Sequence, residues 1–230
     1  MDKITKKEKV QQLCNKNGWE FALFVKYVDL IEEKNKVMNL TGFTGDRLWE
    51  EGILESLYFM EEITKGLHKG EILDIGAGAG FPSIPYVLTK PDNHVTIYEP
   101  IGKRVNFLNE VIDSLKLQDY VTVYKMRSEE QKEKNLFGIV TARAVADVRA
   151  LLMSSFHLVK VNGNMALLKG IKVHDELKEA GEILSKLDCT IDLKEFINSD
   201  VKRDNFILTF TKKRSTPKEF PYLWKDIKKK

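Results

Sequence analysis

The spacing of apolar residues divides the chain into a helical first part and a mixed second part. Over residues 1–66, apolar side chains recur every three or four positions, which is the period of an amphipathic helix. Three such segments follow one another, and their apolar faces include Leu13, Val28 and Leu57. We therefore expect an N-terminal cap made of three helices.

From residue 67 to residue 230 the rhythm changes to strand-length apolar runs that alternate with helical segments. The expected strands are residues 71–75, 94–98, 120–125, 136–142, 163–169, 189–195 and 204–212. The expected helices are residues 82–89, 102–116, 147–157 and 173–186. This alternation is typical of an α/β fold with a mostly parallel sheet that helices cover on both faces. Only Asn198-Ser199-Asp200 separates the last two strands, so we expect them to pair as an antiparallel hairpin.

Three glycines follow the first expected strand. Gly76, Gly78 and Gly80 alternate with alanines just after Asp74, and without Cβ atoms such a turn can lie directly against a ligand. Phe81 stands where the dinucleotide fingerprint needs its third glycine, and it fits either a ligand contact or a core position. An acid before the turn suits a cationic ligand better than a pyrophosphate. The turn therefore favours S-adenosylmethionine over NAD, and with seven strands it predicts a class I (Rossmann-like) methyltransferase fold over residues 67–230.

Polar residues follow the next three strands. In a doubly wound sheet, ligands bind at the carboxyl ends of the strands. Glu99 ends the second strand, where a carboxylate can accept hydrogen bonds from both ribose hydroxyls of an adenosine. Ser128 and Glu129 follow the third strand, where an adenine contact is expected, although the pair also fits a solvated helix start. Arg143 follows the fourth strand and can hold an anionic group of the cofactor or a substrate phosphate, or else pair with Asp147.

Composition and charge narrow the class of protein. With 43% apolar and 31% charged residues, the chain is typical of soluble globular proteins, and no apolar run approaches the ~20 residues of a membrane span. The N-terminus lacks an apolar signal segment, and Cys14 and Cys189 show no metal-ligand spacing, so we expect a cytoplasmic protein without a metal site. Residues 3–16 carry five lysines against one acid, and residues 212–230 carry eight Lys or Arg against two acids. These basic ends fit either contacts with nucleic-acid phosphates or solvated ends.

Several segments together resemble the bacterial RsmG (GidB) family. The matching segments are Asn39 to Thr41, Asp74 to Pro82, Tyr98 to Leu108, Val140 to Ala146 and Ala166 to Gly170. The resemblance covers residues 10–220, in order and with the spacing of the family. It implies an S-adenosylmethionine-dependent methyltransferase that modifies a guanine N7 of 16S ribosomal RNA, either free or in a precursor of the small ribosomal subunit. We expect the enzyme to act as a monomer.

The resemblance also assigns residues to the cofactor, and the chain departs from the family at two places. By resemblance, the cofactor-binding positions are those of Gly76, Phe81, Ser128, Glu129 and Arg143. The third cap helix keeps the acid and serine of the family as Glu55-Ser56, but it lacks the histidine that many relatives carry before them. The C-terminal end is rich in lysine, whereas relatives often end in a Pro-Arg-rich tail. Both departures concern RNA contacts rather than the cofactor site.

The chemistry of the acceptor decides between the remaining alternatives. Guanine N7 is an unprotonated nucleophile, so its methylation needs alignment but no general base, and we assign no catalytic residue. The residues after the fourth strand, 141–144, lack the Asn/Asp-Pro-Pro-aromatic motif typical of exocyclic amine methylation, and neither cysteine is placed for attack on cytosine. A small-molecule methyltransferase on the same fold is the main alternative, because a fold does not determine its acceptor. An NAD-dependent oxidoreductase is disfavoured by the missing glycine, and a non-catalytic RNA-binding module leaves the cofactor residues unexplained.

Overall fold

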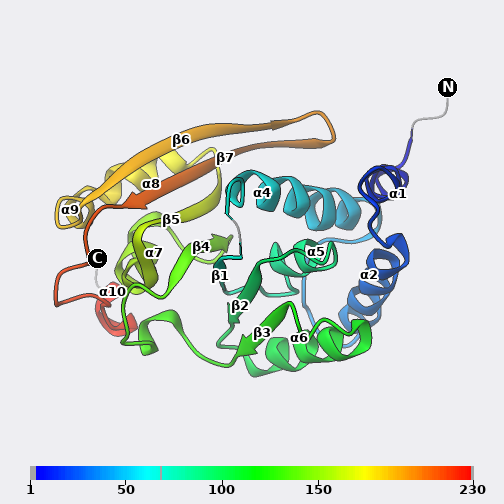
Figure 1. The fold of residues 1–230 in the computed structure, drawn as a ribbon, viewed down its shortest axis with the longest axis horizontal. Helices are drawn as coiled ribbons and strands as arrows, with labels where there is room; N and C mark the ends of the chain where they lie inside the picture. Colours follow the sequence, from blue (N-terminus) through cyan, green and yellow to red (C-terminus); the bar gives the residue numbers. More distant parts are fainter. Residues whose placement is uncertain (1–3, 68, 229–230) are drawn as a thin grey trace.

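A seven-stranded sheet forms the centre of the molecule (Figure 1), seen in a computed structural model that describes residues 4–67 and 69–228. The strands are β1 (Glu71–Ile75), β2 (His94–Tyr98), β3 (Val121–Tyr124), β4 (Phe137–Arg143), β5 (Val159–Gly170), β6 (Cys189–Asn198) and β7 (Val201–Lys212). Their order across the sheet is β3-β2-β1-β4-β5-β7-β6. Strands β1 to β5 run parallel, and β7 runs antiparallel to both β5 and β6. The expected α/β class and the antiparallel hairpin are confirmed.

Helices cover both faces of the sheet. The first group consists of α1 (Lys6–Asn17), α2 (Phe21–Asn35), α3 (Gly45–Arg47), the π-helix η1 (Leu48–Leu54), α4 (Glu55–Ile63), α5 (Ser83–Val87) and α6 (Gly102–Leu115). The second group consists of the 3-10 turn η2 (Ser128–Glu130), α7 (Val148–Ser155), the 3-10 turn η3 (Phe156–Leu158), α8 (Val173–Glu179), α9 (Gly181–Leu184) and α10 (Trp224–Ile227). None of the helices in the described part of the chain is long and apolar enough to cross a membrane.

The two faces of the sheet have separate apolar cores. On one face, Phe24 and Ile53 of the N-terminal helices share a buried cluster with Ile72 of β1 and Phe107 of α6. On the other face, α7 to α10 pack against a second cluster. The N-terminal helices therefore pack on the same face of the sheet as α5 and α6 and share one apolar core with them. The domain boundary between residues 66 and 67 stays a prediction.

The register of the strands gathers their functional ends at one edge. Ile75 pairs with Tyr98 on one side and with Ala142 on the other, so β1, β2 and β4 end side by side. Gly170 at the end of β5 pairs with Asn205 near the start of β7. The carboxyl ends of the parallel strands and the beginning of β7 thus meet at a single edge of the sheet.

Several predicted elements differ in extent from the structure. The helix expected over residues 173–186 is broken into α8 and α9, and the second part starts at Gly181, a residue that weakens a helix. Strand β5 begins at Val159, before polar residues that concealed its start, and its register against β4 shifts near Phe137. The hairpin strands reach Asn198 and Val201, further than their apolar pattern predicted. Each difference reflects a tertiary contact or a local irregularity that apolar spacing does not record.

The C-terminal segment, residues 215–228, is packed onto the protein. Thr216, Phe220 and Ile227 are buried, and the backbone N–H of Tyr222 donates to the carbonyl of Met153 on α7 at 3.0 Å. These contacts place the segment against the helical layer of the second face (Figure 1). The backbone of this segment is therefore packed onto the protein, while its basic side chains at Lys218, Lys225 and Lys228 stay exposed, as expected for solvated charges.

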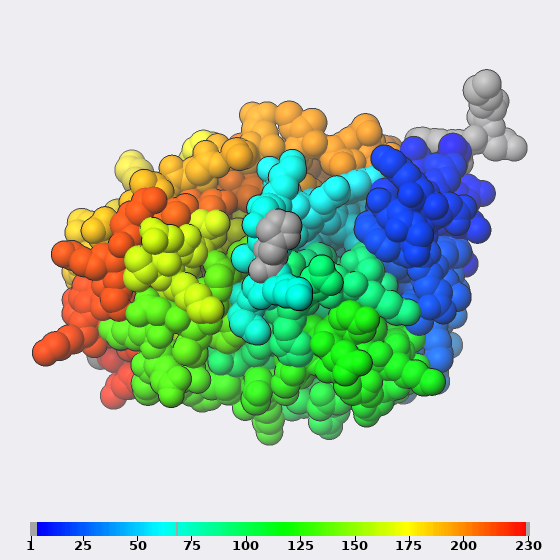
Figure 2. Space-filling view, in the orientation of Figure 1, coloured from blue at the N-terminus to red at the C-terminus, as the bar shows by residue number. Residues whose placement is uncertain are grey.

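The two basic ends of the chain lie at opposite ends of the molecule (Figure 2). Two lysines of α1 form ion pairs with other parts of the chain. Lys6 Nζ lies 3.3 Å from Glu50, and Lys9 Nζ lies 3.3 Å from Asp200 at the tip of the β6–β7 hairpin. Lys3, Lys229 and Lys230 fall outside the described residues. Within residues 4–228, apart from the undescribed residue 68, the basic side chains of the two ends therefore do not form one continuous surface.

Candidate functional site

The three glycines of the loop after β1 serve two different purposes. All three have left-handed backbones, with φ of +68° at Gly76, +62° at Gly78 and +109° at Gly80, which other residues rarely adopt. A Cβ at Gly76 would lie 2.8 Å from Val145, and one at Gly80 would lie 2.5 Å from Ile84. A Cβ at Gly78 would meet no protein atom within 4 Å. The first and third glycines therefore allow packing, whereas the second borders open space.

Glu99 is buried and joins the end of β2 to the glycine loop. Its side chain is only 1% exposed, so the reading as a solvated loop acid is excluded. One carboxylate oxygen accepts from the backbone N–H of Gly78 at 3.1 Å, and the other accepts from that of Ile101 at 2.9 Å. Each carboxylate oxygen can accept a second hydrogen bond. The carboxylate therefore sets the shape of the loop and keeps acceptor capacity for a ligand.

Asp74 lies beneath the same loop as a second buried carboxylate. It is fully buried, and one oxygen accepts from the hydroxyl of Ser83 at 2.6 Å. Among the described residues the other oxygen, Oδ1, has no hydrogen-bond partner. Burial raises the pKa of Asp74 to about 7, because the low-dielectric interior disfavours the charged form. The loop thus stands over a carboxyl group that titrates near neutral pH.

A small cavity brings together residues from four parts of the chain. It measures about 60 Å³ and is lined by Gly76, Tyr98, Ser128 and Glu129, together with Trp224 from α10. Ser128 and Glu129 lie in η2 and are both buried, so the reading of the pair as a solvated helix start is wrong. The hydroxyl of Ser155 on α7 donates to the hydroxyl of Ser128 at 2.8 Å. The structure therefore places Gly76, Ser128 and Glu129 around one cavity.

Phe81 takes the core position rather than the ligand-facing one. Its ring is 7% exposed and packs edge-on against Tyr27 at a centroid distance of 6.0 Å and beside Phe43 at 6.2 Å. A Cβ at Gly52 in η1 would lie 2.9 Å from the Phe81 ring, so this glycine allows the π-helix to approach it closely. Phe81 therefore connects the glycine loop to the N-terminal helices.

Arg143 pairs with the N-terminal helices and not with Asp147. Its guanidinium lies 2.7 Å from a carboxylate oxygen of Glu55 and donates to the hydroxyl of Ser56 at 3.1 Å. Asp147 instead accepts from the backbone N–H of Ala150 and caps α7. Burial raises the pKa of Glu55 and lowers that of Arg143, while the attraction between their charges opposes both shifts. The Arg143–Glu55 pair therefore links the end of β4 to the start of α4.

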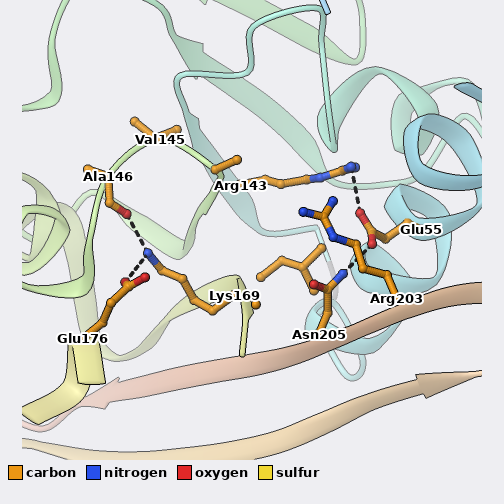
Figure 3. Close-up of a pocket in the computed structure, with 11 residues that line it drawn as sticks. Glu55, Arg143, Val145, Ala146, Lys169, Glu176, Arg203 and Asn205 are labelled. Atoms are coloured by element: carbon orange, nitrogen blue, oxygen red, sulfur yellow. Dashed lines mark hydrogen bonds and ion pairs between the residues drawn. The ribbon is translucent and has the colours of Figure 1, made fainter. Parts of the chain in front are cut away.

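A second cavity of about 330 Å³ lies beside this pair (Figure 3). Arg203 and Asn205 of β7 enter it from the hairpin side, and the amide of Asn205 donates to Glu55. Lys169 at the end of β5 donates to the carbonyl of Ala146 at 2.6 Å and pairs with Glu176 at 2.8 Å. Of these groups the sequence indicated only Arg143 and the acid–serine pair. It did not indicate Arg203 and Asn205, because β7 reaches this edge through antiparallel pairing with β5.

The loop that follows β4 contributes to the lining of both cavities. Val145 and Ala146 line both of them, and Val145 packs over Gly76. Glu55 pairs with Arg143, and Lys169 pairs with Glu176, so the charged groups around the second cavity are largely neutralised by one another. Two cavities that share part of their lining can bind two molecules next to each other. The second cavity holds its charges in fixed pairs, which suits positioning better than proton transfer.

Comparison with known proteins gives a consistent result. A family model described as rRNA small subunit methyltransferase G (GidB) matches residues 20–207. The chain is 35% identical over 226 residues to ribosomal RNA small subunit methyltransferase G of Mycoplasmopsis pulmonis, covering 96% of this chain and 97% of that one. It is 41% identical over 188 residues to the protein of the same name from Mesomycoplasma hyopneumoniae strain J, covering 77% and 91%.

Solved structures with little sequence identity share the fold. The crystal structure of M. jannaschii TYW2 in complex with AdoMet superposes with a TM-score of 0.53 at 18% identity, over 73% of this chain and 78% of that one. At this identity the likeness concerns the arrangement of strands and helices alone.

Proposed function

The chain belongs to the rRNA small subunit methyltransferase G family, and we propose that it transfers a methyl group from S-adenosylmethionine to N7 of a guanine in the RNA of the small ribosomal subunit. The observation that carries this proposal is that Val145 and Ala146 line two cavities, one beside the glycine loop and one beside Arg143. A methyl donor and a methyl acceptor must lie next to each other in this way for direct transfer.

The residues of the first cavity and of the glycine loop beside it fit S-adenosylmethionine, which supplies a methyl group on a cationic sulfur. Gly78 borders open space, and Glu99 retains acceptor capacity beside it. We propose that Glu99 binds the ribose, and that Gly76, Ser128 and Glu129 surround the adenine. Gly80 and Phe81 face the core, so their proposed part is to hold the loop in shape.

The residues of the second cavity fit an acceptor that needs orientation and no base. N7 of guanine carries a free lone pair, so the protein must align it and accept the positive charge of the product. Arg143 is proposed to act here through its pair with Glu55, which fixes the wall of the acceptor cavity. Arg203 is half-exposed at the rim and pairs with Glu51 at 2.9 Å, and a guanidinium has five N–H donors, so we propose that it also meets a phosphate of the RNA.

The proposal is tested by mapping modified nucleotides in ribosomal RNA by mass spectrometry. RNA from a strain lacking the gene should lose one 7-methylguanine from its small-subunit RNA, and the purified protein with S-adenosylmethionine should restore it. A Gly78→Leu variant serves as a control without cofactor binding, because its side chain would fill the open space beside the loop.

Two outcomes would contradict the proposal. An unchanged set of modified nucleotides in the deletion strain would show that small-subunit ribosomal RNA is not the substrate. Restoration of a methyl group at an exocyclic amine or at a carbon would keep the enzyme class and overturn the assignment to N7.

A further inference from the structure

We propose that Trp224, in the C-terminal segment, is a cofactor-positioning residue that forms one wall of the adenine end of the S-adenosylmethionine site. This inference rests on the proposed function, because it concerns the same cofactor. It adds a residue that lies beyond the matched part of the family model, which ends at residue 207. It also gives the packed C-terminal segment a part in binding.

The position of Trp224 is the first support. The ring lines the small cavity together with Tyr98, Met126 and Leu151, while Ser128 and Glu129 contribute polar groups. A narrow cavity with apolar walls and a few polar groups at one side suits a flat aromatic ring with a hydrogen-bonding edge. Adenine is the part of S-adenosylmethionine that has this character.

The anchoring of the segment is the second support. Arg149 of α7 donates to the carbonyl of Ile227 at 3.1 Å, and the backbone N–H of Tyr222 donates to the carbonyl of Met153 at 3.0 Å. Phe220 and Ile227 are buried on either side of Trp224 in the sequence. Because α7 also contributes Leu151 and Ser154 to the cavity, the helix that holds the segment and the wall of the cavity are the same element.

The surroundings of the ring are the third support. The guanidinium of Arg127 lies 5.2 Å from the centre of the Trp224 ring, and Arg127 also lines the cavity. A guanidinium over an indole is an attractive contact that limits the orientations of both groups. The ring is therefore held in place before a ligand binds, so its contribution to binding costs little ordering.

The experiment measures cofactor affinity without any RNA. Calorimetry compares S-adenosylhomocysteine and adenosine as ligands of the full-length protein and of Trp224→Ala. We expect the dissociation constants of both ligands to rise by about tenfold and by the same factor, because both carry the adenine. Leu223→Ala is the matched control, since Leu223 precedes Trp224, is 47% exposed and does not line the cavity.

A second measurement keeps the test independent of whether Trp224→Ala folds. Replacing Trp19 and Trp49 by Phe leaves Trp224 as the only tryptophan among the three of the chain. Its fluorescence should change on titration with adenosine, and it should not change with methionine alone.

The results separate the two proposals. Wild-type affinity in a folded Trp224→Ala protein, or a silent Trp224 signal on adenosine binding, overturns the inference and leaves the proposed function standing. Absence of S-adenosylhomocysteine binding to the unaltered protein would overturn the proposed function itself. Parallel losses for both ligands, with Leu223→Ala unchanged, support Trp224 as the adenine wall.

Discussion

At the scale of single residues, two buried carboxylates, Asp74 and Glu99, lie next to the glycine loop. Glu99 accepts hydrogen bonds from two backbone N–H groups, one on each carboxylate oxygen. Asp74 is enclosed below the loop, and among the described residues one of its oxygens has no hydrogen-bond partner. Burial with a single hydrogen-bond donor favours the protonated form of Asp74. The two acids therefore contribute differently to binding and to stability.

Glu99→Ala should weaken the binding of S-adenosylhomocysteine by about 1.5–3 kcal/mol, because a hydrogen bond to a charged group is lost. It should also lower the melting temperature, because the backbone N–H groups of Gly78 and Ile101 lose their acceptor. Calorimetry and thermal unfolding measure the two effects. Glu99→Gln, which keeps an oxygen acceptor, should lie between the two proteins, and unchanged affinity in Glu99→Ala would limit Glu99 to a structural part.

Asp74→Asn should make the protein more stable at pH 8, by about 1–3 kcal/mol, because an ionised carboxylate is no longer buried. The pKa of Asp74 in the folded protein is about 7, above its ordinary value of 3.8. The folded state therefore holds the proton more tightly, so the wild type loses stability as the pH rises from about 4 toward 7 and above. Thermal unfolding between pH 4 and pH 8 should show the gap between variant and wild type widening with pH. A gap that is constant over this range would contradict the buried, titrating carboxyl.

At the scale of elements, a lysine inside the second core joins three of them. Lys212 at the end of β7 is fully buried, and its Nζ donates to the carbonyls of Phe156, His157 and Val159 at 3.2, 3.1 and 2.6 Å. The ammonium therefore satisfies the carbonyl groups where η3 ends and β5 begins. A residue that the sequence grouped with the basic end of the chain thus serves the interior.

Lys212→Met should destabilise the protein by about 3–5 kcal/mol, because the carbonyls stay buried without their donor. Lys213→Met is the matched control, since the neighbouring side chain is exposed. Chemical denaturation of the two variants gives the free energies of unfolding. Equal values would mean that water replaces the ammonium at little cost.

At the scale of the whole molecule, the antiparallel β7 carries basic residues to two opposite edges of the sheet. Arg203 near its start lies at the edge with the two cavities, and Arg214 follows its end at the other edge. Both side chains are more than half exposed, at 51% and 76%. The two arginines therefore form a matched pair for locating the RNA.

Arg203→Gln should weaken RNA binding and reduce the dependence of log affinity on log salt by about one unit, as expected when one phosphate contact is lost. Arg214→Gln should leave both quantities unchanged, and neither variant should alter cofactor affinity. Titrations of small-subunit RNA at several salt concentrations test this. Equal effects of the two substitutions would place the RNA elsewhere or show a merely general attraction.

Removing the chain after Arg214 should lower both the melting temperature and the affinity for S-adenosylhomocysteine. The cut deletes the buried side chains of Phe220 and Ile227, whose loss from a core typically costs about 2–5 kcal/mol each. A cut after Lys228 is the control, because it removes only two lysines. A stable protein with full cofactor affinity after the longer deletion would contradict the packed C-terminal segment.

The sequence by itself determined the features that are written in local patterns. The period of the apolar residues predicted the alternation of strands and helices, and the glycines and the residues at strand ends predicted the cofactor. The RsmG (GidB) family is confirmed by the comparisons. These features could be recognised because glycine conformations and the ends of strands depend on residues that are close in the chain.

Only the tertiary structure decided which distant residues share a site. Arg143 meets Glu55 and not Asp147, Phe81 turns into the core, and Trp224 reaches the cavity of Ser128 across almost a hundred residues of chain. The sequence also did not show which lysines are buried, because a buried lysine such as Lys212 and an exposed one such as Lys213 are the same letter in a sequence. The physical reason is that pairing across the sheet and packing between its two cores join segments far apart in the chain, and apolar spacing carries no record of those partners.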